Sequence, residues 1–283
     1  MISLKSKTVK DLLREMTALF KENGAEDAAL DASLILMRQL GFSRTELYTK
    51  DDYCPDENQM RKIDYWAEKH AEGCPVQYLL GKCEFMGLTI KVQDMVLIPR
   101  ADTETLVETV SEIIKEKSYK TGLDLGTGSG CIAVSLSSLN KGLKMTASDI
   151  SLRPIFIAEQ NAKDHKADIN FVLSDLFENI EGKFDFIVSN PPYIPTEVIP
   201  TLEKNVKNYE AEKALDGGKD GLDYIRKIIE QAPSYLNPGG LLAFETGYDQ
   251  REAVDALFKA AGYKNINHKN DLGGRHRVSW GFV

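Results

Sequence analysis

Apolar residues recur at every third or fourth position through the first eighty residues, which is the spacing of helices with one buried face. Thr8 is a suitable N-cap for the first helix. The three predicted helices span about 8–24, 27–41 and 55–73. No residues here form a catalytic constellation, so the pattern predicts a small helical bundle that holds a partner or substrate.

The pattern changes near residue 84, where apolar and polar residues alternate over 84–92 and predict a hairpin between two domains. A helix follows Pro99 and Arg100, with Asp102 or Thr103 as its expected N-cap. Arg100 is compatible with a solvated loop charge and with a group that points into the site. The predicted organisation is a helical domain (1–82), a hairpin linker (83–95) and a larger domain (96–283).

From Thr121 onward, short apolar runs alternate with amphipathic helical segments, which is typical of a parallel sheet with helices on both faces. The predicted strands span 121–125, 144–148, 169–173, 184–189, 240–246, 263–268 and 275–282. One of the intervening helices is expected at about 222–235. The fold class of the larger domain is therefore α/β.

Composition narrows the function without identifying it. The 283 residues carry a net charge of −8, which disfavours a protein whose main task is to grip nucleic-acid phosphates. No apolar run approaches membrane length, and we expect a cytoplasmic protein without a membrane partner. The four cysteines and four histidines show no metal-binding spacing, so no metal site is predicted. No long apolar patch or heptad pattern stands out, which favours a monomer.

A glycine-rich loop follows the predicted strand 121–125 and precedes a helix: Gly126-Thr127-Gly128-Ser129-Gly130. Glycines allow tight backbone geometry there and let a ligand lie against the helix N-terminus. Asp149 ends the next strand and is placed to accept hydrogen bonds from ribose hydroxyls. A dinucleotide fingerprint would have glycine at Cys131, so the loop favours S-adenosylmethionine over a nicotinamide cofactor.

A second loop, Ser189-Asn190-Pro191-Pro192-Tyr193, follows the apolar run 184–188. The two prolines hold Asn190 extended at the carboxyl end of a strand, where ligands bind in open α/β sheets. The Asn190 side-chain carbonyl and the Pro191 backbone carbonyl are two acceptors that suit an –NH2 group. Tyr193 adds a flat face for a planar amide or base. An ordinary turn at the end of a strand could have the same residues. The glycine loop and Asp149 upstream favour the interpretation as a ligand-binding site.

Together these motifs resemble class I (Rossmann-like) adenosylmethionine-dependent methyltransferases that act on planar nitrogen. More closely, four segments are similar to the HemK/PrmC family, the release-factor glutamine methyltransferases: 75–81, 98–104, 189–194 and 217–222. The likeness covers essentially the whole chain. It implies transfer of a methyl group from S-adenosylmethionine to the side-chain amide nitrogen (N5) of the glutamine in the Gly-Gly-Gln motif of peptide chain release factors, which act in translation termination.

The resemblance also implies roles for individual residues. Asn190 with the Pro191 carbonyl would hold the glutamine amide, and Tyr193 would pack beside it. The cofactor would contact Gly126 to Gly130 at its methionine part, Asp149 at its ribose, and Asp175 and Leu176 at its adenine. The resemblance thus implies Asn190, Pro191, Pro192 and Tyr193 as catalytic residues. Asn190 is also expected to contact the cofactor. Two positions depart from the family pattern: Ala211 stands where proline is usual, and Pro154 is expected to interrupt the helical run after Asp149.

Two other functions remain open on the residues alone. A methyltransferase acting on an exocyclic amine of adenine or guanine in DNA or RNA could use the same loop for a flipped base. It would need a basic face, and the densest basic run, Arg275-His276-Arg277, is short and falls in a predicted edge strand. A non-catalytic sensor of an adenosine ligand would have no use for an amide-binding loop.

Overall fold

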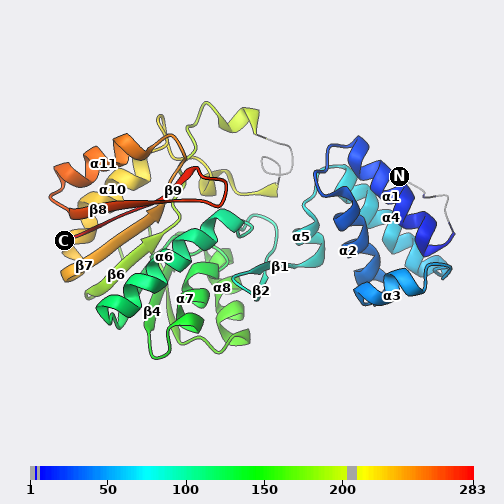
Figure 1. Ribbon diagram of the computed structural model, residues 1–283, viewed down its shortest axis with the longest axis horizontal. Coiled ribbons are helices and arrows are strands. Elements are labelled where there is room, and N and C mark those ends of the chain that lie inside the picture. Colours follow the sequence, from blue (N-terminus) through cyan, green and yellow to red (C-terminus); the bar gives the residue numbers. More distant parts are fainter. Residues whose placement is uncertain (1–3, 5–6, 203–208) are drawn as a thin grey trace. The chain divides into compact units, whose positions relative to one another are not determined.

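The computed structural model describes residues 4, 7–202 and 209–283, which divide into two compact units (Figure 1). The first unit runs through Gly81 and the second begins at Lys82. The described residues of the first unit contain five helices: α1 (Val9–Glu22), α2 (Ala28–Leu40), α3 (Arg44–Thr49), α4 (Glu57–Ala71) and α5 (Val76–Leu80). Their apolar stripes meet in one core that includes Leu12, Phe20 and Ile35. Within the described residues, no helix is both apolar and long enough to cross a bilayer.

Helices α1, α3 and α4 each start directly after a residue whose side chain caps the helix. The Thr8 side chain accepts a hydrogen bond from the Asp11 backbone N–H, as the pattern predicts. The helix expected to open at Pro55 begins two residues later, at Glu57. Asp56 and Gln59 form a capping box there, in which each side chain accepts from the other residue's backbone N–H.

The second unit is a mixed α/β fold. The hairpin pairs β1 (Lys82–Phe85) with β2 (Leu88–Lys91), and seven strands form one sheet in the order β5-β4-β3-β6-β7-β9-β8. These strands are β3 (Thr121–Leu125), β4 (Lys144–Asp149), β5 (Ile169–Leu173), β6 (Phe184–Ser189), β7 (Leu236–Glu245), β8 (Lys264–Asn270) and β9 (His276–Phe282). The first five are mutually parallel, and β9 runs antiparallel to both of its neighbours.

Helices cover both faces of this sheet (Figure 1). The principal helices are α6 (Ala101–Lys117), α7 (Cys131–Leu139), α8 (Leu152–Asp164), α10 (Asp223–Gln231) and α11 (Arg251–Ala260). Apolar residues of α10 and α11 share one core cluster with β3, β6 and β7, among them Ile225, Phe258 and Ile187. The sheet is therefore buried on both sides, which agrees with the near-continuous apolar runs of its parallel strands.

Three local expectations were wrong. Helix α6 starts at Ala101 with Arg100 in the cap position, so neither Asp102 nor Thr103 caps it; both lie inside its first turn. Strand β9, expected at the edge, lies between β7 and β8. Pro154 does not interrupt a helix, because it occupies the first turn of α8, where a missing backbone N–H costs no intrahelical hydrogen bond.

Candidate active site

The pairing register aligns the ends of four parallel strands in one row. Leu125 of β3 lies opposite Ser148 of β4 and Ser189 of β6, and Ser189 lies opposite Phe244 of β7. The next residue of each strand therefore lies at the same edge of the sheet: Gly126, Asp149, Asn190 and Glu245. From β3 the chain adds β4 and β5 on one side of the sheet and then β6 and β7 on the other side. Ligands of open α/β sheets bind at the point between β3 and β6 where the strand order reverses in this way.

The glycine loop after β3 adopts backbone conformations that favour glycine. Gly126, Gly128 and Gly130 have φ values of 71°, 56° and 80°. A Cβ added at Gly130 would lie 2.8 Å from the Ala158 Cβ, so this glycine lets the loop pack closely on α8. A Cβ added at Gly126 or Gly128 would meet nothing within 4 Å, which leaves space beside the backbone for a ligand.

The residues between the glycines of this loop form hydrogen bonds with β3 and α8. Thr127 donates its hydroxyl to Asp124 Oδ2 at 2.6 Å, and the Ser129 carbonyl accepts from Asn161 Nδ2 of α8 at 2.8 Å. Thr127 and Ser129 are both buried. The Thr127 side chain and the Ser129 backbone carbonyl therefore stabilise the loop, while open space remains beside Gly126 and Gly128.

Asp149 connects the ends of β3 and β4. Its Oδ2 accepts from the Gly128 N–H and its Oδ1 from the Ser151 N–H, each at 3.0 Å. Burial raises the pKa of Asp149, and these two backbone hydrogen bonds oppose that shift. A carboxylate has about four lone-pair sites, so two remain for hydroxyl donors.

The loop after β5 brings Asp175 and Leu176 to the same edge. Ser174 N donates to the Asp149 carbonyl at 2.9 Å, and the Ser174 hydroxyl donates to the Leu176 carbonyl at 2.9 Å. Leu176 has a φ of 46° and packs against the core, whereas Asp175 is exposed. Gly126, Asp149 and Asn190 thus lie at the carboxyl ends of neighbouring strands, and Asp175 and Leu176 lie in the loop after β5.

Asn190 is held by a buried hydrogen-bond network. Its Nδ2 donates to Thr103 Oγ1 at 3.2 Å, and the Thr103 hydroxyl donates to Glu245 Oε2 at 2.6 Å. The Tyr193 hydroxyl donates to the other carboxylate oxygen, Oε1, at 3.0 Å. Thr103 and Glu245 are 2 % and 1 % exposed. Sequence reasoning missed both as site residues, although Glu245 ends a buried apolar strand beside β6, a position that could have suggested a role.

The Tyr193 hydroxyl belongs to this hydrogen-bond network. Burial is the main cause that raises the pKa of Tyr193, and the neighbouring Glu245 adds to it. The phenol therefore stays protonated at neutral pH and acts as a hydrogen-bond donor. Gln250 Nε2 donates to the Tyr193 carbonyl at 2.9 Å, which fixes the backbone of the same residue.

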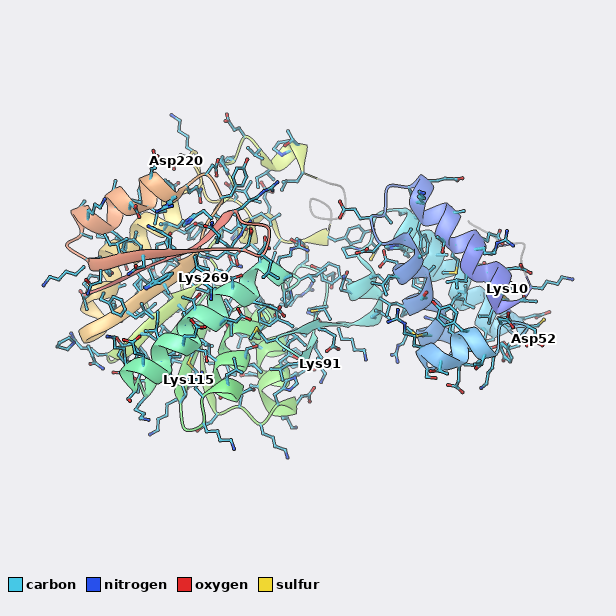
Figure 2. The ribbon with its side chains drawn as sticks, viewed as in Figure 1. Lys10, Asp52, Lys91, Lys115, Asp220 and Lys269 are labelled. Atoms are coloured by element: carbon cyan, nitrogen blue, oxygen red, sulfur yellow. The ribbon has the colours of Figure 1, made fainter. Side chains whose placement is uncertain are left out.

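Two glycines let a later segment pack against this motif. A Cβ added at Gly217 would lie 2.8 Å from the Pro192 carbonyl oxygen, and one added at Gly221 would lie 2.3 Å from the Tyr193 carbonyl oxygen. Between them, Asp220 forms an ion pair with Arg226 at the surface, where Asp220 is labelled in Figure 2. The segment 217–222 therefore braces the backbone of the loop that carries Asn190.

Two arginines near the site form ion pairs with acids. Arg100 Nη2 lies 2.5 Å from Oε1 of the buried Glu210, which ties the start of α6 to the segment after the Asn190 loop. Arg277 is buried between Asp102 and Asp271, at 3.0 and 3.2 Å. Within the basic run 275–277, Arg277 is therefore paired with acids and His276 is buried, which leaves Arg275 as the exposed cation.

Comparison with known proteins shows the family of the chain. Two family models match it: the PrmC N-terminal domain at residues 11–81 and the methyltransferase small domain at 101–207. The release factor glutamine methyltransferase of Geobacter sulfurreducens is 38% identical over 278 residues, covering 98% of this chain and 97% of that one. The enzyme of the same name from Clostridium botulinum is 40% identical over 275 residues, covering 95% and 97%. The chain belongs to the release factor glutamine methyltransferase family.

A solved structure agrees with the methyltransferase fold. The ribosomal protein L11 methylase from Lactobacillus delbrueckii subsp. bulgaricus matches with a TM-score of 0.50 and 24% identity, covering 68% of this chain and 83% of that one. Ala211, which departs from the family pattern, has a φ of −67°, a value that proline also adopts. Alanine at this position therefore preserves the backbone geometry that the family proline would impose.

Asp124 lies in the buried part of β3, and its titration makes the free energy of unfolding depend on pH. Burial raises its pKa from 3.8 to about 7. Between these values the folded protein binds more protons than the unfolded chain, so this carboxyl lowers the free energy of unfolding as pH rises from about 4 to 7. We expect Asp124→Asn, which keeps an oxygen for Thr127, to gain thermal stability relative to the wild type as pH increases.

Thermal melts of both proteins from pH 5 to pH 8, without cofactor, measure this difference. The pH dependence of the difference is the readout, so a constant loss of stability from the substitution itself does not obscure it. Melting temperatures that run parallel across this range would show that Asp124 does not titrate in it.

Proposed function

We propose that this protein transfers a methyl group from S-adenosylmethionine to the side-chain amide nitrogen of the glutamine in the Gly-Gly-Gln motif of peptide chain release factors. The observation that carries the proposal is the position of Asn190. It follows the strand beside β3, next to the glycine loop, with its amide nitrogen bound to Thr103. Within the described part of the chain, no group donates to Asn190 Oδ1, so this oxygen is available to accept from a substrate.

The glycine loop and Asp149 fit the proposed cofactor. The space beside Gly126 and Gly128 accommodates an extended ligand chain, and Asp149 keeps two acceptor sites for ribose hydroxyls. Asp175 and Leu176 would border the adenine. When bound, S-adenosylmethionine would supply an electrophilic methyl group on a sulfonium, and S-adenosylhomocysteine would be the leaving group.

The chemistry of an amide determines what the chain's own residues must do. The nitrogen lone pair of an amide is delocalised into its carbonyl, so the nitrogen is a weak nucleophile. Asn190 Oδ1 and the Pro191 carbonyl would accept hydrogen bonds from the two amide N–H groups. These bonds strengthen as positive charge develops on nitrogen, so they stabilise the transition state more than the ground state. Positioning by the two prolines adds to this effect.

The proton of the alkylated amide leaves late, when the nitrogen has become acidic, so no strong base is required. Tyr193 would pack beside the substrate amide while its hydroxyl remains bound to Glu245. Pro192 fixes the direction in which the chain leaves the site. The helical unit would contact the release factor. We expect the enzyme to be a monomer and to act in the cytoplasm.

The test is to incubate the purified protein with S-adenosylmethionine and an unmethylated release factor, with duplex DNA and tRNA as parallel substrates. Mass spectrometry then locates any methyl group. A single methyl on the Gly-Gly-Gln glutamine supports the proposal. Methyl found on nucleic acid alone would overturn the substrate and leave the fold intact.

A further inference from the structure

An asparagine side chain has two different ends, and the proposed function needs the correct one. The oxygen end accepts from a substrate N–H, whereas the nitrogen end would place one donor against another. The sequence of the Asn190 loop does not determine which end faces the substrate. The groups that contact Asn190 from other elements must do so.

The direction of the hydrogen bonds starts at Glu245. An ionised carboxylate can only accept, and Glu245 receives a hydroxyl from Thr103 on one oxygen and from Tyr193 on the other. A threonine hydroxyl has a single hydrogen. Once Thr103 donates it to Glu245 at 2.6 Å, its oxygen can only accept from Asn190. The Asn190 side chain must then direct Nδ2 toward Thr103 and Oδ1 away from it.

We infer that Thr103 and Glu245 are positioning residues that fix the orientation of the Asn190 amide and so make the site select a glutamine amide over a carboxylate. This inference rests on the proposed function. With the amide reversed, Asn190 would offer an N–H to the substrate side chain. It would then repel the –NH2 group of glutamine and bind a glutamate carboxylate at the same place.

Two hydroxyl donors and a cation surround Glu245. Burial raises the pKa of Glu245, and the hydrogen bonds from Thr103 and Tyr193 and the nearby Arg277 oppose that shift in part. Arg277 is itself held by Asp102 and Asp271. Thr103 and Asp102 come from the first turn of α6, so the same turn positions both the relay and the cation that supports it.

The experiment compares Thr103→Val, which removes the hydroxyl and keeps the shape, with Thr103→Ser, which keeps the hydroxyl. Thr109→Val is the matched control, because Thr109 is a buried threonine of the same helix whose hydroxyl donates to the Thr105 carbonyl. Each enzyme is assayed with S-adenosylmethionine and the normal release factor. A release factor in which glutamate replaces the Gly-Gly-Gln glutamine serves as a competitive inhibitor.

We expect Thr103→Val to lower kcat/KM for the normal release factor about tenfold, because one hydrogen bond of the network is lost and the amide is free to reverse. The ratio of the glutamate inhibition constant to the glutamine KM should fall by a similar factor. Thr103→Ser should stay within about threefold of the wild type on both measures, and Thr109→Val should leave the ratio unchanged.

Glu245→Gln tests the origin of the relay, since its side-chain amide has a donor end that allows the Thr103 hydroxyl to point the other way. The glutamate-to-glutamine ratio should fall here too. If the ratio of the glutamate inhibition constant to the glutamine KM is unchanged in Thr103→Val, the inference is wrong. If it is unchanged only in Glu245→Gln, the role assigned to Glu245 is wrong. A wild-type enzyme that does not methylate the glutamine would refute the proposed function instead.

Discussion

Replacement of Asn190 by alanine is expected to lower kcat for glutamine methylation by about 10²–10³, the usual loss when one preorganised group that stabilises transition-state charge is removed. The acceptor is lost at the point where positive charge develops on the substrate nitrogen. The Pro191 carbonyl and the cofactor site remain, so the dissociation constant for S-adenosylmethionine should change less than about threefold, the effect of a lost contact well under 1 kcal/mol.

Single-turnover methylation followed by mass spectrometry measures the rate, and isothermal titration measures cofactor binding. Asn140→Ala is a suitable control, because Asn140 is a buried asparagine at the end of α7 that bonds to Ser111 and to the Leu136 carbonyl of that helix. An Asn190→Ala enzyme that keeps most of its kcat would contradict the role assigned to Asn190.

The strands of the sheet could be predicted because their signal is local. Short apolar runs ended by glycine, proline or aspartate gave the strand at 184–189 with the bounds that β6 has, and the helical stripe after Thr8 gave α1. The two motifs were also placed correctly at strand ends. Their proximity followed from one general property, that the carboxyl ends of parallel strands lie at one edge of a sheet.

The errors came from tertiary partners. Asp102 and Thr103 have the side chains of N-caps, but Arg277 and Glu245 bind them instead, across 142 residues in the case of Glu245. Strand β9 was expected at an edge because its antiparallel insertion between β7 and β8 leaves no local pattern. The relay that orients Asn190 was invisible for the same reason: each of its members comes from a different element.

Cofactor affinity should depend most strongly on Asp149. We expect Asp149→Ala to weaken S-adenosylmethionine binding by about 10²-fold, since hydrogen bonds to charged groups contribute about 1.5–3 kcal/mol each. The substitution also releases the Gly128 N–H that the carboxylate now holds at 3.0 Å. Asp149→Asn should be impaired as well, because its –NH2 would have to face the N–H of either Gly128 or Ser151.

Isothermal titration gives the affinity, and methylation at saturating cofactor separates binding from chemistry. Asp168→Asn, at an exposed aspartate, is the matched control. Both Asp149 variants should lose much of the thermal stabilisation that S-adenosylmethionine gives the wild type, because that stabilisation scales with the logarithm of ligand concentration over the dissociation constant. If the Asp149 variants bind S-adenosylmethionine more weakly but keep their kcat at saturating cofactor, Asp149 acts in cofactor binding and Asn190 in the chemical step. An unchanged dissociation constant in Asp149→Ala would instead remove the ribose role, and Asp149 would then act only through the backbone of the glycine loop.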